Sequence, residues 1–134
     1  MNPRSLSVSV SDHSYPIFMG AGLLEDFREY LPGHLHKKSL FVVCDRSVKQ
    51  QALKVSKECP LLEIESGEAA KSLKVLETIL EWLLTHKIDR SSAIISVGGG
   101  VTGDLVGFAA SIVLRGVPII HVPTTLLSMV DSSV

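Results

Sequence analysis

The feature that most restricts the fold of this chain is an apolar run that leads directly into a cluster of glycines. Ser92–Val97 (SAIISV) has the pattern of a strand that is covered on both faces, and Gly98, Gly99, Gly100 and Gly103 follow it at once. A strand that passes through a G-x-G-x-x-G turn into a helix lets backbone N–H groups approach a pyrophosphate at the start of that helix. Glycine turns also serve close packing between strand and helix, so both interpretations are open at this point.

Strands and helices alternate along the rest of the chain, which predicts right-handed crossovers and a doubly wound, mostly parallel α/β sheet of the Rossmann-like kind. A helix in the middle of the chain is expected to pack on the core through Leu73, Leu76, Leu80, Leu83 and Leu84. The expected strands are a pair at Leu6–Val10 and Tyr15–Met19, then Ser39–Cys44, Leu61–Ile64, Ser92–Val97 and Val117–Val122. The expected helices are Leu23–Leu31, Ser47–Glu58, Glu68–His86 and Asp104–Leu114, with a further helix that opens at Pro123, Thr124 and Thr125.

Charge is distributed unevenly along the chain. There are 13 Lys and Arg against 14 Asp and Glu, and this balance argues against a nucleic-acid partner, because such proteins concentrate basic residues on one face. All but three of these charges lie in residues 1–90, and the exceptions are Asp104, Arg115 and Asp131. The longest uncharged run between them, Gly116–Val130, is shorter than the roughly 20 residues that a bilayer requires, so we expect no membrane span. Charged side chains are costly to bury, and the last third of the chain is otherwise apolar. Asp104, Arg115 and Asp131 are therefore the first candidates for binding a small molecule.

Two aspartates fall where ligands of open α/β sheets bind. Asp45 follows the strand Ser39–Cys44, where it can accept hydrogen bonds from ribose hydroxyls or cap the next helix. Asp104 comes one residue after Gly103 and is expected in the first turn of its helix, where the helix dipole favours a carboxylate even without a ligand. A carboxylate repels a pyrophosphate, so we expect Asp104 to meet a ribose or substrate hydroxyl instead.

Three further charged side chains and the cysteines complete the candidates. Glu68 and Lys71 place an acid and a base one turn apart, although alone they form only a solvated pair. Arg115 has the planar fork that suits a phosphate or carboxylate, and it also suits the C-terminal end of a helix. The five histidines show no tight metal-ligand spacing, so no metal site is predicted in this chain. Cys44 and Cys59 are interpreted as reduced core thiols, which with the lack of a secretory signal pattern predicts a cytoplasmic protein.

Taken together, these motifs resemble the 3-dehydroquinate synthase family over essentially the whole chain. The glycine segment and the final segment are specific to the sugar-phosphate cyclases, and their looser parts also occur in polyol and iron-type alcohol dehydrogenases. The matching stretches are YPIFMGAGLL (15–24), Asp45, SGEAAKS (66–72), SVGGGVTGDLVGFAAS (96–111) and LRGVPIIHVPTTLLSMVDSSV (114–134).

The resemblance implies that residues 1–134 are the NAD-binding, Rossmann-like N-terminal domain of a two-domain enzyme whose helical C-terminal domain is absent. It implies a lyase of the shikimate pathway, and thus of aromatic amino acid biosynthesis, that converts 3-deoxy-D-arabino-heptulosonate 7-phosphate to 3-dehydroquinate and phosphate. The implied cofactors are NAD and a zinc (or cobalt) ion. In the family the zinc ligands follow the Asp-Ser-Ser-Val motif, beyond Val134. We therefore expect residues 1–134 to have no catalytic activity alone. The whole enzyme is expected to be a cytoplasmic homodimer.

The resemblance also assigns roles to individual residues. Asp131 is implied as a substrate contact, and Arg115 as a phosphate ligand that reaches the site of a neighbouring subunit, whereas at Ser47 the family commonly has Asn. The alternatives are a related cyclase such as 2-deoxy-scyllo-inosose synthase, a polyol dehydrogenase domain, a non-catalytic nucleotide-binding module and a remnant that only packs against another chain. The implied cofactor contacts are Asp45, Glu68, Lys71, Gly100, Val101, Thr102, Gly103, Asp104, Thr124 and Thr125.

Overall fold

A computed structural model describes residues 2–134 of the chain. The chain divides into two compact units, Met1–Lys37 and Lys38–Val134, and each is described by itself. That the whole of 1–134 acts as one nucleotide-binding domain stays a prediction.

The first unit is built on an antiparallel strand pair, as predicted. Strand β1 (Arg4–Val10) pairs with β2 (His13–Met19) in a register that runs from Arg4 opposite Met19 to Val10 opposite His13. The prediction of a helix at Leu23–Leu31 is wrong. Residues 21–26 form turns, and they are followed by two short 3-10 helices, η1 (Phe27–Tyr30) and η2 (Gly33–Leu35). A stretch this short lacks the packed apolar face that stabilises short helices in proteins.

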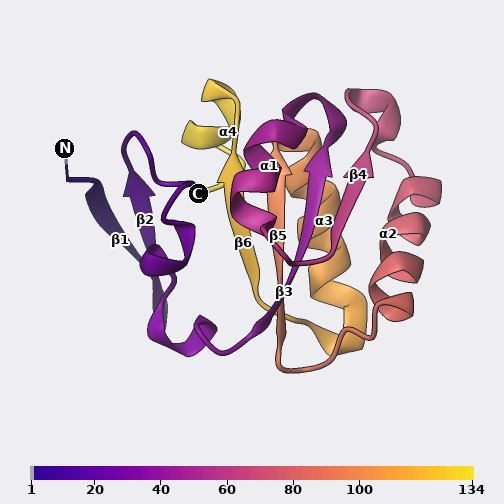
Figure 1. Cartoon of the computed structure of the whole chain (residues 1–134), viewed down its shortest axis with the longest axis horizontal. Helices are drawn as coiled ribbons and strands as arrows, with labels where there is room; N and C mark the ends of the chain where they lie inside the picture. The colour runs from indigo at the N-terminus through magenta and orange to yellow at the C-terminus, as the bar shows by residue number, and fades with distance from the viewer. Residues whose placement is uncertain (1) are drawn as a thin grey trace. The chain divides into compact units, whose positions relative to one another are not determined.

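The second unit contains a four-stranded sheet in which every neighbouring pair is parallel. Its strands are β3 (Ser39–Asp45), β4 (Leu61–Ile64), β5 (Ser92–Gly98) and β6 (Ile119–Pro123), in the order β4-β3-β5-β6. Figure 1 shows all four arrowheads at one edge of the sheet. Because β3 connects outward to β4 and β5 connects outward to β6 in the opposite direction, the winding reverses between β3 and β5, where ligands of open α/β sheets bind.

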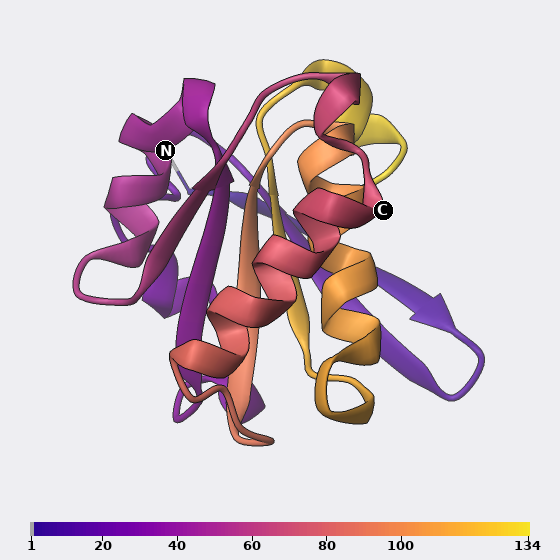
Figure 2. The same ribbon diagram turned by 90° about the vertical axis from the view of Figure 1, so that its right-hand side faces the viewer.

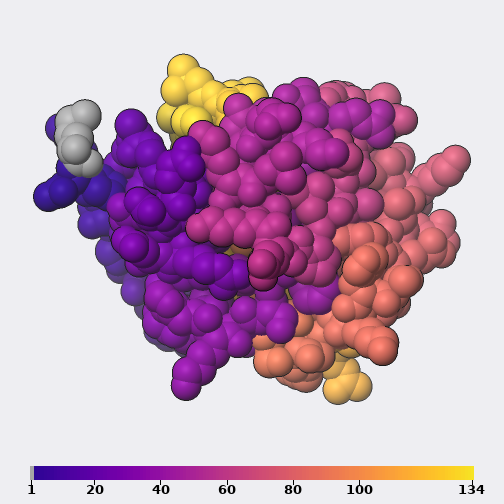
Figure 3. Space-filling model, in the orientation of Figure 1, coloured from indigo at the N-terminus to yellow at the C-terminus, as the bar shows by residue number. Residues whose placement is uncertain are grey.

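Helices cover both faces of this sheet, which confirms the doubly wound α/β prediction. Helix α1 (Lys49–Ser56) lies on one face, and α2 (Leu73–Thr85) and α3 (Gly100–Ile112) lie on the other (Figures 1 and 2). The space-filling view in Figure 3 shows α1 and the loop after it, in magenta, covering the first of these faces. A short helix, α4 (Leu126–Val130), follows β6. Among residues 2–134, no helix is both long and apolar enough to cross a bilayer.

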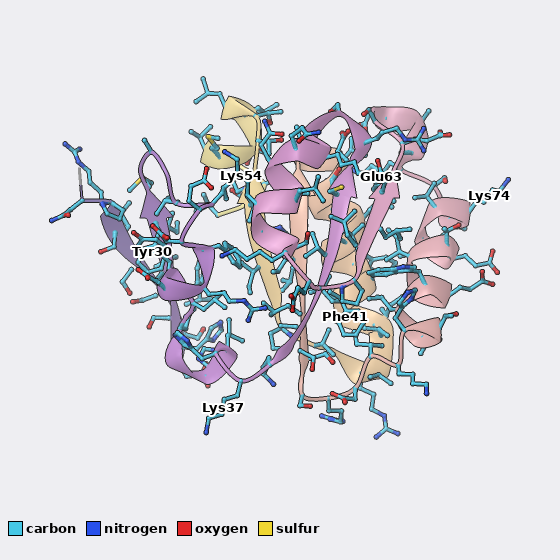
Figure 4. The ribbon with its side chains drawn as sticks, in the orientation of Figure 1. Tyr30, Lys37, Phe41, Lys54, Glu63 and Lys74 are labelled. Carbon is cyan, nitrogen blue, oxygen red and sulfur yellow. The ribbon has the colours of Figure 1, made fainter. Side chains whose placement is uncertain are left out.

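The larger part of the core lies between the sheet and the helices α2 and α3. Phe41 of β3 (Figure 4) meets Trp82 of α2 edge to face, with ring centroids 6.0 Å apart. The ring of Trp82 is only partly buried, whereas Ile79 and Leu83 of the same helix are fully buried. Strand β5 is buried along its whole length, as its apolar sequence predicted.

The predicted leucine stripe on the middle helix is correct only in part. Leu76 and Leu83 are buried, but the side chains of Leu73 and Leu84 are 82% and 57% exposed. The helix predicted from Glu68 is divided into the 3-10 helix η4 (Glu68–Ala70) and α2, which begins only at Leu73. Leu73 therefore lies in the first turn, ahead of the residues that face the core. Ile79, absent from the predicted stripe, occupies the centre of the buried face.

Candidate functional site

The carboxyl edge of the sheet brings together segments that are far apart in the sequence. Cys44 of β3 pairs with Val97 of β5, so Asp45 and the glycine turn leave neighbouring strands at the same level. On the other side of β5, the N–H of Thr124 donates to the carbonyl of Gly98 at 2.9 Å. The end of β3, the glycine turn and the segment after β6 thus share one edge, at the point where the winding of the sheet reverses.

Helix α3 begins within the glycine turn, four residues earlier than predicted. Gly99 precedes the first helical residue, Gly100, and the N–H of Gly103 donates to the carbonyl of Gly99 at 3.0 Å. Within the described part of the chain, no side chain caps this helix, so the N–H groups of Gly100–Thr102 point out of its first turn. Asp104 lies in the second turn, so the prediction that the helix dipole stabilises its carboxylate in the first turn is wrong.

The glycines of the turn fall into two groups. A Cβ atom on Gly98 would lie 2.6 Å from Thr102 Oγ1, and one on Gly99 would lie 3.2 Å from Thr125 Cγ2. Close packing therefore explains these two glycines. At Gly100 and Gly103 the nearest atoms would be 3.4 and 3.5 Å away, which is ordinary contact, so packing does not explain why these positions lack a side chain. The absence of side chains there leaves room for a ligand against the start of α3.

Asp45 is fixed by hydrogen bonds at the end of β3. Its Oδ1 accepts the N–H of Ser47 at 2.8 Å and the hydroxyl of Ser47 at 2.7 Å, and it also accepts the hydroxyl of Ser66. The predicted capping role is confirmed, because Asp45 caps the 3-10 helix η3 (Arg46–Val48) that leads into α1. Burial acts to raise the pKa of Asp45, but these hydrogen bonds outweigh burial and hold the pKa below its usual value. Its carboxyl group is therefore ionised at neutral pH.

Lys71 pairs with Asp104 and not with Glu68. Lys71 Nζ lies 2.7 Å from Asp104 Oδ2, and both side chains are about half exposed. The hydrogen bond that Lys71 donates to Asp104, and then the negative charge of Asp104, raise the pKa of Lys71. Glu68 is exposed in η4, after Gly67, whose φ of 89° favours glycine. The predicted acid–base pair of Glu68 and Lys71 is thus replaced by an ion pair between η4's C-terminal end and α3.

The last segment of the chain adds two threonines and an aspartate. Thr125 caps α4 in a reciprocal pair of hydrogen bonds. Its Oγ1 accepts the N–H of Ser128 at 3.2 Å, and the Ser128 hydroxyl oxygen accepts the N–H of Thr125 at 3.4 Å. Thr124 joins β6 to this cap, and Asp131 follows α4 with an exposed side chain.

Arg115 lies apart from the other predicted site residues. It ends the 3-10 helix η5 (Val113–Arg115) between α3 and β6, at the amino edge of the sheet, and its side chain is exposed. Its φ of 68° and the φ of 108° at Gly116 turn the chain sharply back into β6. The structure therefore does not bring Arg115 to the glycine turn of its own chain.

A histidine that the sequence interpretation left aside borders the site. His121 of β6 pairs in register with Ser96 of β5, and His121 Nδ1 lies 2.9 Å from Ser96 Oγ. Burial lowers the pKa of His121, and the negative charge of Asp104 partly opposes that effect. A small cavity of about 10 Å³ lies beside the ring and reaches Ser132 and Ser133. The sequence signal for His121 was its position as a single histidine within a predicted apolar strand.

Comparison with known proteins identifies the family. Residues 61–134, more than half of the chain, match the family described as 3-dehydroquinate synthase N-terminal. The chain belongs to this family. Full-length 3-dehydroquinate synthases align along it from end to end: that of Rhodospirillum rubrum is 44% identical over 96% of this chain, and that of Methylacidiphilum infernorum is 45% identical over 100%. This chain covers only 36% and 40% of those proteins.

A solved structure extends the comparison to the fold. A 2-deoxy-scyllo-inosose synthase, crystallised with carbaglucose-6-phosphate, NAD+ and Co2+, superposes with a TM-score of 0.83 at 29% identity, over 96% of this chain and 38% of that one. The sugar-phosphate cyclase fold is thus shared. Within residues 2–134, no group of three or more His, Cys, Asp or Glu side chains is placed to hold a metal ion.

Proposed function

We propose that this chain contributes the NAD-binding part of a 3-dehydroquinate synthase, a lyase that converts 3-deoxy-D-arabino-heptulosonate 7-phosphate to 3-dehydroquinate and phosphate. One observation carries the proposal: the ionised Asp45 and the uncapped start of α3 lie on adjacent strands where the winding of the sheet reverses. A dinucleotide needs both a hydrogen-bond acceptor for a ribose hydroxyl and backbone N–H donors for its pyrophosphate. The 44–45% identity to whole synthases supports this choice of reaction over that of the cyclase neighbour, which is 29% identical.

The residues present fit the nucleotide. Asp45 would accept hydrogen bonds from a ribose hydroxyl, and the N–H groups of Gly100–Thr102 would donate to the pyrophosphate oxygens. The bare Gly103 would let the nucleotide approach the helix backbone. Lys71 would add positive charge near the phosphates, and its partner Asp104 would then be free for a hydroxyl. When bound, NAD supplies the hydride acceptor of the reaction.

The remaining predicted contacts lie around the same edge. Thr124 bonds to Gly98 and Thr125 packs on Gly99, whereas Glu68 lies in η4 after β4. We assign these three residues to the rim of the nucleotide site. Asp131, exposed after α4, is assigned to the substrate, where its carboxylate would hold a hydroxyl group.

Arg115 is assigned to the phosphate of the substrate in a neighbouring subunit. Its place at the amino edge of the sheet, away from the glycine turn, supports a role outside its own site. This assignment requires a homodimer. The acidic and histidine side chains described here do not fit a zinc site, so we derive no step through the metal from them and assign its ligands to the part of the synthase that this chain does not cover. The buried Cys44 thiol agrees with a reducing, cytoplasmic location.

Titration calorimetry with NAD tests the proposal. Wild-type chain should bind NAD, and Gly103→Trp should abolish binding, because the indole would fill the space against α3. Gly33→Trp is a matched control, since a Cβ there meets no atom within 4 Å and Gly33 lies in the other unit. Equal heats for wild type and Gly103→Trp, or no binding by wild type, would defeat the proposal. Circular dichroism would show whether each variant is folded.

A further inference from the structure

The hydrogen bonds to Asp45 come from two different segments of the chain. Ser47 provides two of the three donors, its N–H and its hydroxyl, from the residues directly after β3. Ser66 provides the third from the loop after β4, 21 positions along the chain. All three bonds that the described residues make to this carboxylate end on Oδ1, which leaves Oδ2 for a ligand.

A second aspartate in the same unit shows what such a turn needs by itself. Asp89, before β5, accepts the N–H of Ser91 at 2.8 Å and the hydroxyl of Ser91 at 2.7 Å, also on Oδ1. Its third donor is the neighbouring Ser92, at 3.2 Å. Every donor to Asp89 is thus local, and the distances match those between Asp45 and Ser47. A donor from a distant segment, such as Ser66, is therefore not a general part of this turn.

Ser66 instead ties the end of β3 to the end of β4. Asp45 pairs with Ile64 in the parallel register, so the loop that carries Ser66 leaves the sheet next to the carboxylate. Gly67 follows with a φ of 89° and turns the chain away into η4. With donors on two sides, the Asp45 carboxylate is held in one rotamer before any ligand arrives.

We infer that Ser66 is a positioning residue for nucleotide binding, which fixes the Asp45 carboxylate so that Oδ2 is presented to a ribose hydroxyl. This inference deepens the proposed function and rests on it. Ser66 acts through Asp45, and no contact between Ser66 and the nucleotide is needed. The benefit is one of preorganisation, because the side chain of Asp45 loses less rotamer freedom when the ligand binds.

Calorimetric NAD titrations of the 134-residue chain test this inference with three variants. Ser66→Ala should raise the Kd about fivefold, the scale expected for ordering one side chain on binding. Ser66→Thr keeps the hydroxyl and should restore wild-type affinity. Ser91→Ala removes a serine hydroxyl that donates to Asp89 and should leave the Kd unchanged, although it too removes a hydrogen bond from a serine hydroxyl to an aspartate carboxylate.

The two proposals fail in different ways in this experiment. Wild-type affinity for NAD in Ser66→Ala, or an equal loss in Ser91→Ala, would overturn the role of Ser66 while the proposed function stands. A loss that Ser66→Thr does not restore would also overturn it. Wild-type chain that binds no NAD would instead defeat the proposed function itself. Thermal melts would show that each variant is folded at the temperature of the titration.

Discussion

Lys71 and Asp104 form an ion pair, with Nζ and Oδ2 2.7 Å apart, across 33 positions of the sequence. The pair joins the segment before α2 to the second turn of α3, and it lies beside the glycine turn. Both side chains are about half exposed, so the pair contributes little to the stability of the fold. Under the proposed function, the pair is assigned to the ligand and not to the core.

Replacing Lys71 should therefore affect binding more than folding. Lys71→Met should weaken NAD binding several-fold at low salt, because it removes positive charge near the phosphates, and the effect should shrink at high salt. The thermal midpoint should change little. Lys74→Met is the matched control, since Lys74 points outward from α2 (Figure 4) and should leave binding unchanged. Calorimetric titrations at two salt concentrations give the comparison, and equal effects of the two variants would contradict it.

His121 should make the stability of the second unit sensitive to mild acid. Its pKa is lowered in the folded state, mainly by burial, so the unfolded chain takes up the proton first as the pH falls. Stability is therefore fully present above the unfolded pKa of about 6.5 and is lost as the pH falls from there toward the folded pKa. Urea midpoints at pH 7.5 and 5.5 should show a loss in wild type that is smaller in His121→Gln, which keeps a partner for Ser96.

The exposed His34 provides a control for that measurement. His34→Gln should retain the full pH dependence of the wild type, because His34 is exposed. A pH dependence that is identical in wild type, His121→Gln and His34→Gln would show that His121 is not the group responsible.

Most of the sheet could be predicted from local patterns, because buried parallel strands are continuous apolar runs. Ser92–Val97 and Leu61–Ile64 were predicted within one residue of β5 and β4 for that reason. The start of α3 was placed too late because glycine is a poor helix former, yet Gly100 and Gly103 lie inside this helix. The close packing of Gly98 and Gly99 on threonines depends on tertiary contacts and leaves no local signal.

The sequence predicted which residues lie at the candidate site better than it predicted the contacts between them. Asp45 capped the following turn as its position suggested, but the donor Ser66 comes from the loop after another strand and leaves no local signal. In the same way Lys71 has a nearer acid in sequence, Glu68, yet its ion pair is with Asp104. Spacing within one segment identifies which side chains can act, whereas pairings between segments depend on how the sheet is assembled.

The buried face of α2 can be tested by two substitutions that shorten a large apolar side chain. Ile79→Ala should cost about 2–5 kcal/mol of unfolding free energy, because Ile79 is fully buried and its loss leaves a cavity. Leu73→Ala should change stability by less than about 0.5 kcal/mol, since Leu73 is 82% exposed. Urea denaturation measures both. Similar losses for the two variants would mean that Leu73 packs in the core, as the leucine stripe predicted.

The two groups of glycines in the turn should separate stability from binding. Gly98→Ala places a Cβ 2.6 Å from Thr102 Oγ1 and should destabilise the chain by about 1–3 kcal/mol, as overpacking does. Gly100→Ala meets only Ser132 Oγ at 3.4 Å and should leave the unfolding free energy nearly unchanged. It should nevertheless weaken NAD binding, because the methyl group occupies the approach to the first turn of α3. Urea denaturation and calorimetry on the same two variants measure both quantities. Unchanged NAD affinity in Gly100→Ala would mean that the nucleotide does not approach α3 at this position.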